Sequence, residues 1–259
     1  AEVWLKYEVG NPTSSYKDRM AMSVLANAMS RSDVSLGDTV VEYTGGSTGS
    51  SLAFVSAGLG LKFVAVCSDA FSQSKQQTME AFGAEVIVEK SYGKGITPEL
   101  IGRMKDRMKD RMKDRALDIC DNSNAYYADQ FGSPNVTAGY EPMGQGIIGA
   151  LGRGVDLFCA AVGTAGALMG AWQGMVKSGS NPSVVAFEPE QSPCLSTGEG
   201  GAHQVEGVGF EPPFLDRAVL SEIRTVDPEL GFSMCRRLAK EEGILCGAST
   251  GLNVAGAIE

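Results

Sequence analysis

Short apolar runs alternate with helix-favouring stretches along most of the 259-residue chain, and this alternation restricts its fold more than any other feature. Apolar and β-branched residues at 39–43 and 62–68 are typical of strands. The run at 155–162 is apolar almost throughout, which predicts a strand buried on both faces. Strands that alternate with helices indicate parallel sheets with crossover helices, the α/β class. The strands expected on this basis are residues 2–9, 39–43, 62–68, 84–90, 155–162 and 183–189.

The segments between these strands have helical periodicity. In residues 17–30, one face of the expected helix carries only apolar side chains, such as Met20 and Leu25. Thr97-Pro98 and Asp227-Pro228 each place a capping residue before a proline, which predicts helix starts. The perfect repeat "RMKDRMKDRMKDR" at 103–115 is interpreted as the solvated face of a helix. The expected helices are residues 17–30, about 47–57, 73–82, one from 97, one after 163, and 227–243.

The loop-rich segment "DNSNAYYADQFGSPN" separates an earlier group of strand–helix units from a later one. This predicts two α/β domains, residues 1–140 and 141–259, each with a parallel-rich twisted sheet; the first strand could pack with the second domain. The last twelve residues resemble a turn and an opening helix, so the second domain is expected to be incomplete at its C-terminus. Ligands of open α/β sheets bind beyond the carboxyl ends of the strands, which predicts a cleft between the domains.

Charge and residue counts exclude several kinds of function. The formal net charge is −9, whereas a nucleic-acid partner requires a basic face. No apolar run approaches the roughly 20 residues that span a bilayer. The single histidine, His203, allows neither an HExxH motif nor a two-histidine metal site, and we expect no metal. Six cysteines without a CxxC pair, of which Cys67 and Cys159 fall in apolar runs, indicate reduced thiols and a cytoplasmic protein.

Three turns rich in glycine or hydroxyl groups follow predicted strands. The backbone N–H groups of "GTAGALMG" (163–170), at a helix start, could bind a phosphate. "TGGSTGS" (44–50) offers donors suited to a carboxylate. "GNPTSSYK" ends at Lys17, in a first helical turn where the helix dipole disfavours a cation. An amino-acid enzyme that uses pyridoxal phosphate (PLP) needs a phosphate cradle, a carboxylate cradle and one lysine, although close packing alone would also explain each turn.

Six motifs, in order, resemble those of the fold-type II PLP enzymes, and the nearest branch is that of cysteine synthase (O-acetylserine sulfhydrylase) and cystathionine β-synthase. "NPTSSYKDRMA" is similar to the motif around the family's Schiff-base lysine, and "EYTGGSTGSSLA" to its substrate-carboxylate loop. "DQFGSPNV" resembles its Gln-Phe-x-Asn-Pro segment, and "GTAGALMG" its phosphate loop. "EGVGFEPPFLD" and "GILCGASTG" resemble its Gln-Gly-Ile-Gly and Gly-Ile-Ser-Ser-Gly segments.

The resemblance implies a role for each matching residue. Lys17 would bind the cofactor as a Schiff base and, once freed, remove the Cα proton of the substrate. The residues implied in cofactor binding are Lys17, Ser47, Gly163, Thr164, Ala165, Gly166, Ala167 and Gly207. Those implied in binding the substrate carboxylate are Thr44, Gly45, Gly46, Ser47 and Thr48, with Gln130 as a helper.

Some positions depart from the family pattern. Ser47 stands where the family usually has an asparagine that contacts the PLP ring hydroxyl. Ala165 replaces a usual glycine and Ala167 a usual threonine, so the backbone donors remain but one hydroxyl is lost. The strand that carries the partner of the pyridine nitrogen in the family would follow Glu259.

The resemblance implies β-replacement on an activated serine, such as O-acetylserine, with sulfide, giving cysteine. It also implies a homodimer that acts on small amino acids. β-Elimination, as in a serine/threonine dehydratase or a cysteine desulfhydrase, uses the same lysine and stays open. A catalytically weak fragment or a regulatory binding homologue is the alternative of another class.

Overall fold

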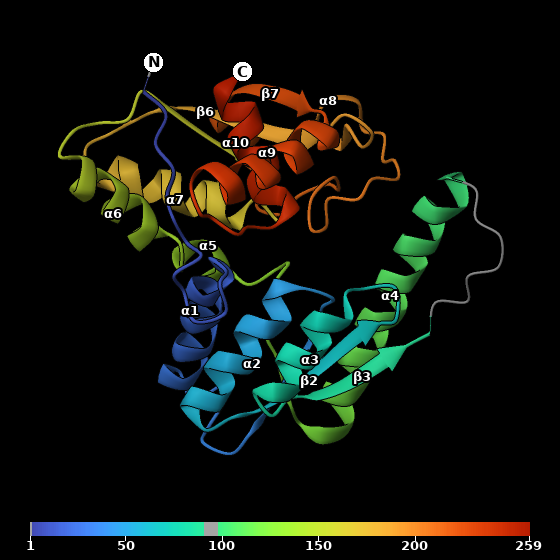
Figure 1. Ribbon diagram of the computed structural model, residues 1–259. Helices are drawn as coiled ribbons and strands as arrows, with labels where there is room; N and C mark the ends of the chain where they lie inside the picture. Colours follow the sequence, from blue (N-terminus) through green and yellow to red (C-terminus); the bar gives the residue numbers. More distant parts are fainter. Residues whose placement is uncertain (1, 91–97) are drawn as a thin grey trace. The chain divides into compact units, whose positions relative to one another are not determined.

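The computed structural model describes residues 2–90 and 98–259, apart from the side chains of residues 98–108. The chain divides into two compact units, each coloured by sequence in Figure 1. The N-terminal unit is Glu8–Gly139, and the C-terminal unit combines Ala1–Tyr7 with Tyr140–Glu259. Thr97, the predicted capping residue, lies outside the described residues.

A parallel four-stranded sheet in the order β3-β2-β1-β4 forms the centre of the N-terminal unit. Because β4, β1 and β2 are parallel neighbours, the turns that follow them gather at one edge of the sheet. The strands are β1 (Thr39–Tyr43), β2 (Lys62–Ser68), β3 (Glu85–Glu89) and β4 (Tyr126–Tyr127). The helices are α1 (Lys17–Ser30), α2 (Ser47–Leu59), α3 (Gln73–Ala81), α4 (Pro98–Ser123) and α5 (Asn135–Ala138).

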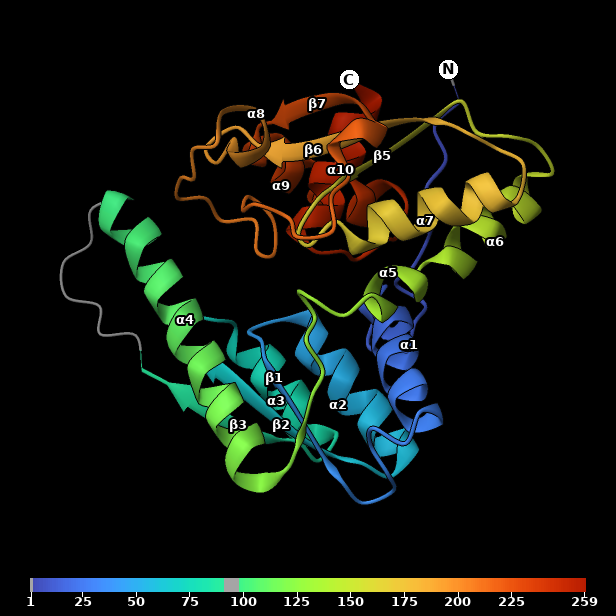
Figure 2. The ribbon, with the colours of Figure 1, turned by 180° about the vertical axis from the view of Figure 1, so that it is seen from behind.

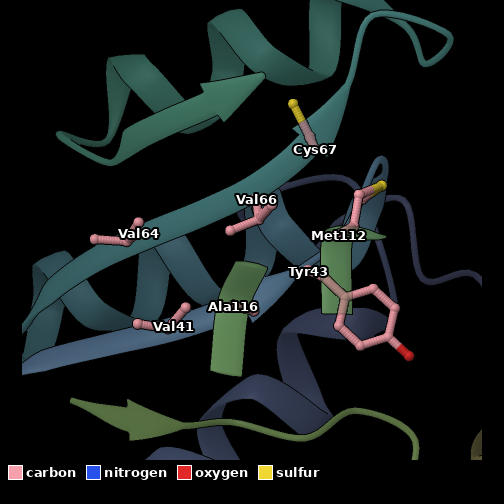
Figure 3. Close-up of a cluster of buried hydrophobic side chains, with 7 residues drawn as sticks. All are labelled: Val41, Tyr43, Val64, Val66, Cys67, Met112 and Ala116. Atoms are coloured by element: carbon pink, nitrogen blue, oxygen red, sulfur yellow. The ribbon is translucent and has the colours of Figure 1, made fainter. Parts of the chain in front are cut away.

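One face of this sheet packs against α4, as Figure 3 shows in close-up. Val41 and Tyr43 point to the same side of β1 because alternate residues of a strand share a face. Met112 and Ala116, four residues apart on α4, pack against them. Met112 is 2% exposed, so the repeat at 103–115 is not wholly a solvated face; of its described residues, Lys109–Arg111 and Lys113–Arg115 are exposed as predicted.

The C-terminal unit contains a three-stranded parallel sheet in the order β5-β6-β7. Val184 of β6 packs with Leu168 of α7, whereas Val185 packs with Leu252 of α10, so helices cover both faces (Figure 2). The strands are β5 (Leu157–Ala161), β6 (Ser183–Pro189) and β7 (Leu220–Val226). The helices are α6 (Glu141–Leu151), α7 (Gly166–Lys177), α8 (Cys194–Thr197), α9 (Pro228–Glu241) and α10 (Ala248–Ile258), with a 3-10 turn at Arg217–Val219.

The predicted boundaries of α1 and the predicted start of α9 are confirmed. α1 covers the predicted residues, and its predicted apolar face is buried. The side chain of Asp227 accepts a hydrogen bond from Glu229 N (3.0 Å) at the start of α9, which confirms it as the N-cap. Gly243, with φ +69°, follows the end of this helix.

Two strand predictions are corrected by the structure. Residues 2–8 have no regular secondary structure, and Trp4 is 65% exposed. A strand needs a neighbouring strand to pair with its backbone N–H and C=O groups, and no described strand pairs with this segment. The run at 155–162 forms β5, but among the described strands β5 pairs only with β6. Leu157 is therefore 52% exposed instead of buried. β4 and β7 were not predicted.

Helices α6 and α7 cross at glycines. A Cβ on Gly144 would lie 1.9 Å from Ala171 O, and one on Gly174 would lie 2.0 Å from Glu141 O. Gly146, two residues further along α6, has no atom within 4 Å of its ideal Cβ position. Replacement of glycine by alanine should therefore have opposite effects on stability at positions 144 and 146 of α6.

We expect Gly144→Ala to lower the free energy of unfolding by about 3 kcal/mol, because the methyl group would force the two backbones apart. Gly146→Ala should instead raise it by about 0.5–1 kcal/mol, because alanine loses less entropy than glycine in a helix. Urea denaturation of both variants beside the unmodified protein measures the difference. Equal effects at the two positions would contradict the observed helix contact.

Candidate active site

Lys17 is the first residue of α1 and its side chain is half-buried. Its backbone N–H donates to Ser15 Oγ (3.2 Å), and its Nζ lies 4.8 Å from the centre of the Tyr16 ring. Among the described residues, no carboxylate forms an ion pair with Lys17. The amine is therefore not committed to a charge partner, which suits a lysine that reacts with a carbonyl group.

A hydrogen-bond network fixes the loop before Lys17 against α2. The buried carboxylate of Asp18 accepts from Thr13 N (2.9 Å) and from Thr13 Oγ1 (2.5 Å). The same hydroxyl lies 3.2 Å from Ser51 Oγ on α2. Ser51 is about one turn beyond Ser47, so the network joins the lysine loop to the helix that begins in the predicted carboxylate loop.

The predicted carboxylate loop leaves β1 and forms the start of α2. Thr44 is buried, and its Oγ1 accepts from Gly46 N (3.4 Å) and Gly49 N (3.2 Å). Gly46 is the N-cap, and Ser47 and Thr48 are the first residues of the helix. Thr44 thus pairs with the N–H groups of Gly46 and Gly49, and the donors that the first turn offers to a ligand are the N–H groups of Ser47 and Thr48, with no acidic side chain in this turn. The loop therefore suits an anion such as a carboxylate.

Phe71, which follows β2, covers part of this loop. A Cβ on Gly45 would lie 2.1 Å from Cγ of the Phe71 ring. The ring itself is 38% exposed. A residue larger than glycine at position 45 would therefore displace the ring.

Gln130 lies beside the carboxylate loop because β4 and β1 are parallel and end at the same edge. Its side-chain Nε2 donates to Tyr43 O (2.9 Å), and its backbone N–H donates to Glu42 Oε2 (2.8 Å). The second oxygen of Glu42 accepts from Tyr43 N (3.0 Å). The rings of Tyr43 and Phe131 stack with their centres 5.3 Å apart, which holds the two segments together on the opposite face of β1.

Glu42 is a carboxyl group in the interior of the N-terminal unit, with 0% of its surface exposed. The pKa of Glu42 is raised from 4.5 to about 8, mainly because burial disfavours the charged form; the bond from Gln130 N lowers the pKa and the charge of Asp129 raises it. Burial is the main cause that raises the pKa of Tyr43, of Tyr127 on β4 and of Cys120 on α4, and the charge of Glu42 raises each of them further. The carboxyl group is thus largely protonated at neutral pH.

This pKa predicts how stability depends on pH. Between pH 4.5 and 8 the folded state holds a proton on Glu42 that the unfolded state releases, so the stability from this group is complete below pH 4.5 and is lost as the pH rises toward 8. The free energy of unfolding of the unmodified protein should therefore fall relative to that of Glu42→Gln over this interval. Urea denaturation at three pH values measures both, and parallel pH profiles would contradict the raised pKa.

The predicted phosphate loop connects β5 to α7. Gly163, Thr164 and Ala165 form the turn, and Gly166 and Ala167 are the first residues of the helix. Thr164 Oγ1 accepts from Gly166 N (3.4 Å), and Thr164 O accepts from Phe214 N (3.1 Å). Ala165 has φ +63°, in the left-handed region that favours the family's usual glycine. The first turn of α7 has no acidic side chain.

Gly207 packs directly on this loop. A Cβ on Gly163 would lie 2.3 Å from Gly207 O, and Gly207 itself has φ +81°. The structure thus brings Gly207 together with the phosphate loop, although the two are more than forty residues apart in the sequence. The N–H groups at the start of a twelve-residue helix and the close glycine contact fit a phosphate group.

The predicted site residues fall into two groups. Lys17, Thr44–Thr48 and Gln130 belong to the N-terminal unit, where the hydrogen bonds described above link the segments next to them. Gly163–Ala167 and Gly207 belong to the C-terminal unit.

Sequence reasoning missed Thr13, Asp18, Glu42 and Phe71. A charged residue within the otherwise apolar run at 39–43 was the available signal for Glu42. Its partner is 88 positions away, which no local pattern predicts.

Comparison with known proteins identifies the class. A family model described as "Pyridoxal-phosphate dependent enzyme" matches residues 1–259. A cysteine synthase of Staphylococcus aureus is 36% identical over 267 residues, which cover 100% of this chain and 80% of that protein. An O-ureido-L-serine synthase of Streptomyces lavendulae is 33% identical over 260 residues, with 99% and 76% covered.

Solved structures give the same result. A hydrogen sulfide-producing enzyme from Fusobacterium nucleatum has a TM-score of 0.86 at 28% identity, covering 98% of this chain and 82% of that one. A cysteine synthase from Entamoeba histolytica has a TM-score of 0.84 at 29% identity, with 97% and 72% covered.

The chain is therefore a pyridoxal-phosphate-dependent enzyme with the fold-type II architecture. Within that class it belongs to the cysteine synthase family. Its cofactor is pyridoxal phosphate. In the described residues, no helix is long and apolar enough to cross a membrane.

Proposed function

We propose that this chain makes cysteine from O-acetylserine, or a similarly activated serine, and sulfide by β-replacement. The observation that carries the proposal is Lys17, which has no described carboxylate partner and is joined through Thr13 and Ser51 to the helix that begins at Ser47. The similarity to cysteine synthases over the whole chain supports the choice of substrates.

The proposed cofactor contacts are those that the family resemblance implies. The backbone N–H groups of Gly163–Ala167, with Thr164 Oγ1, would hold the phosphate, and Lys17 would anchor the cofactor through Nζ. Gly207 would form part of the wall beside it. The Ser47 hydroxyl is shorter than the family's usual amide, so it would contact the cofactor ring less closely or through water. PLP supplies an electron sink that stabilises negative charge at the substrate Cα.

The remaining chemistry falls to the chain's own groups. Thr44–Thr48 would bind the substrate carboxylate through first-turn N–H groups and hydroxyls, with Gln130 as a second donor. Lys17 Nζ, as a free amine, would accept the Cα proton and later return it. In the net reaction the Cβ–O bond breaks, acetate leaves, and sulfide forms the new Cβ–S bond.

Product analysis with and without sulfide tests this function. The purified protein, supplied with PLP and O-acetylserine, should release cysteine and acetate in a sulfide-dependent way. Pyruvate and ammonia without sulfide would overturn β-replacement in favour of β-elimination. Absence of any product, even with added PLP, would favour a catalytically weak fragment or a regulatory binding homologue.

β-Elimination is the second candidate because hydrogen sulfide-producing enzymes are among the similar structures. Incubation with cysteine alone distinguishes it. Release of sulfide at a rate comparable to cysteine synthesis would favour a desulfhydrase.

A cytoplasmic location and a homodimer complete the proposal. The free cysteines, such as the buried Cys67, are consistent with a reducing compartment. The molar mass in solution tests the dimer, and a monomer at working concentration would contradict it.

A further inference from the structure

The hydrogen-bond ladder between β4 and β1 changes its pattern where it reaches the proposed carboxylate site. Ala128 N donates to Val41 O (3.0 Å), as expected for parallel strands. The next donor and acceptor, two residues further along, would be Gln130 N and Tyr43 O. Instead the side chain of Gln130 donates to Tyr43 O, and the backbone N–H of Gln130 donates to the side chain of Glu42.

These two bonds form a reciprocal clasp of one side chain from each segment. The Glu42 carboxyl group reaches from β1 to Gln130 N, and the Gln130 amide reaches back to Tyr43 O. Both side chains are buried, Glu42 completely and Gln130 to 8% exposure. The clasp therefore spaces the ends of the two strands further apart than a direct backbone bond would, while it keeps the buried polar groups paired.

We propose that Glu42 is a positioning residue that sets the place of Gln130 beside the Thr44–Thr48 loop. The role of Gln130 in substrate binding rests on the proposed function, whereas the positioning of Gln130 by Glu42 does not. One N–H of the Gln130 amide is used in the bond to Tyr43 O, and an amide has two. The bond to Tyr43 O thus uses one N–H of the amide and leaves the second one for a ligand, next to the loop that begins at Thr44.

The C-terminal unit offers a matched control. Glu188 is a buried carboxyl group near the end of β6, 1% exposed. It accepts hydrogen bonds from Leu195 N (2.6 Å) and Ser196 N (3.1 Å) at the start of α8. Glu188→Gln therefore makes the same chemical change at a similarly buried site whose carboxyl group accepts from Leu195 and Ser196 instead of Gln130.

The test compares Glu42→Gln with Glu188→Gln in the full chain. A carboxyl group can accept at both oxygens, whereas the NH2 end of glutamine cannot accept, so the Glu42 variant loses either the bond from Gln130 N or that from Tyr43 N. Residue-resolved hydrogen exchange should show that the summed exchange rate of the Gln130 and Tyr43 backbone amides is about tenfold higher in Glu42→Gln than in the unmodified protein. In Glu188→Gln their exchange should be unchanged.

The kinetic readout separates positioning from general destabilisation. In Glu42→Gln, KM for O-acetylserine should rise roughly tenfold while kcat changes less than twofold, because the clasp acts on binding and not on Lys17. If Glu42→Gln fails to fold, Glu42→Asp, which withdraws the carboxyl group by one methylene, supplies the same comparison. If exchange is faster in Glu42→Gln but the unmodified protein has no catalytic activity, the result would support the clasp and reject the proposed function. Unchanged exchange at both amides would overturn the clasp whatever the activity.

Discussion

Replacing Lys17 by alanine is expected to abolish the covalent retention of PLP and to lower kcat/KM by about a thousandfold or more. The variant loses both the amine that would anchor the cofactor and the base that would accept the Cα proton, and a positioned base alone contributes about 10²–10⁴. The fold should survive, because the hydrogen bonds of the lysine loop are made by Thr13 and Asp18 and not by the lysine side chain.

Borohydride reduction followed by peptide mass spectrometry measures the attachment directly. A phosphopyridoxyl group should appear on Lys17 in the unmodified protein and be absent from the variant. Lys62→Ala, at an exposed position at the start of β2, is the matched control and should keep both the label and the activity. A label on another lysine would reject Lys17 as the anchor.

Replacing Gly163 by alanine is expected to weaken PLP binding by roughly a hundredfold. The new methyl group would lie 2.3 Å from Gly207 O, which is a backbone atom that cannot rotate away as a flexible side chain could, so the turn must move. A rearrangement of this size disfavours the original loop by about 2–3 kcal/mol. The N–H groups that would hold the phosphate would move with the turn.

Titration of the cofactor-free protein with PLP, followed by absorption, measures this loss. Gly149→Ala is the control, since an added Cβ there has no atom within 4 Å. Its affinity for PLP should be unchanged. An unchanged affinity in Gly163→Ala would show that the phosphate binds elsewhere.

Sequence patterns predicted β1, β2, β3, β5 and β6 as strands, and of these β1, β2 and β6 have a parallel neighbour on each side. β1, β2 and β6 have long apolar runs because helices cover both faces of their sheets. The two residues of β4 are too few to show a period. The exposed charges of β7, such as Glu222, obscured its strand pattern.

The incorrect prediction at residues 2–9 has a related cause. The segment alternates like a strand, but strand formation depends on a partner, and periodicity does not reveal whether one is present. Periodicity also does not reveal the order of strands in a sheet. The apolar run of β5 therefore did not predict that β5 lies at the edge of the described sheet.

The candidate site was more predictable than the contacts that support it. Local motifs predicted Lys17 and two turns as parts of the candidate site, and each lies at a helix start with a characteristic composition. The clasp of Glu42 and Gln130 arises only when β4 pairs with β1, so the charge at position 42 signals a special residue but does not identify its partner.

The visible absorption spectrum of the purified protein with PLP tests the central claim most directly. A band of lysine-bound cofactor should change when O-acetylserine is added and return when sulfide follows, because the second substrate completes the replacement. A protein that stays colourless with added PLP, or whose band does not respond to O-acetylserine, would contradict the proposed reaction.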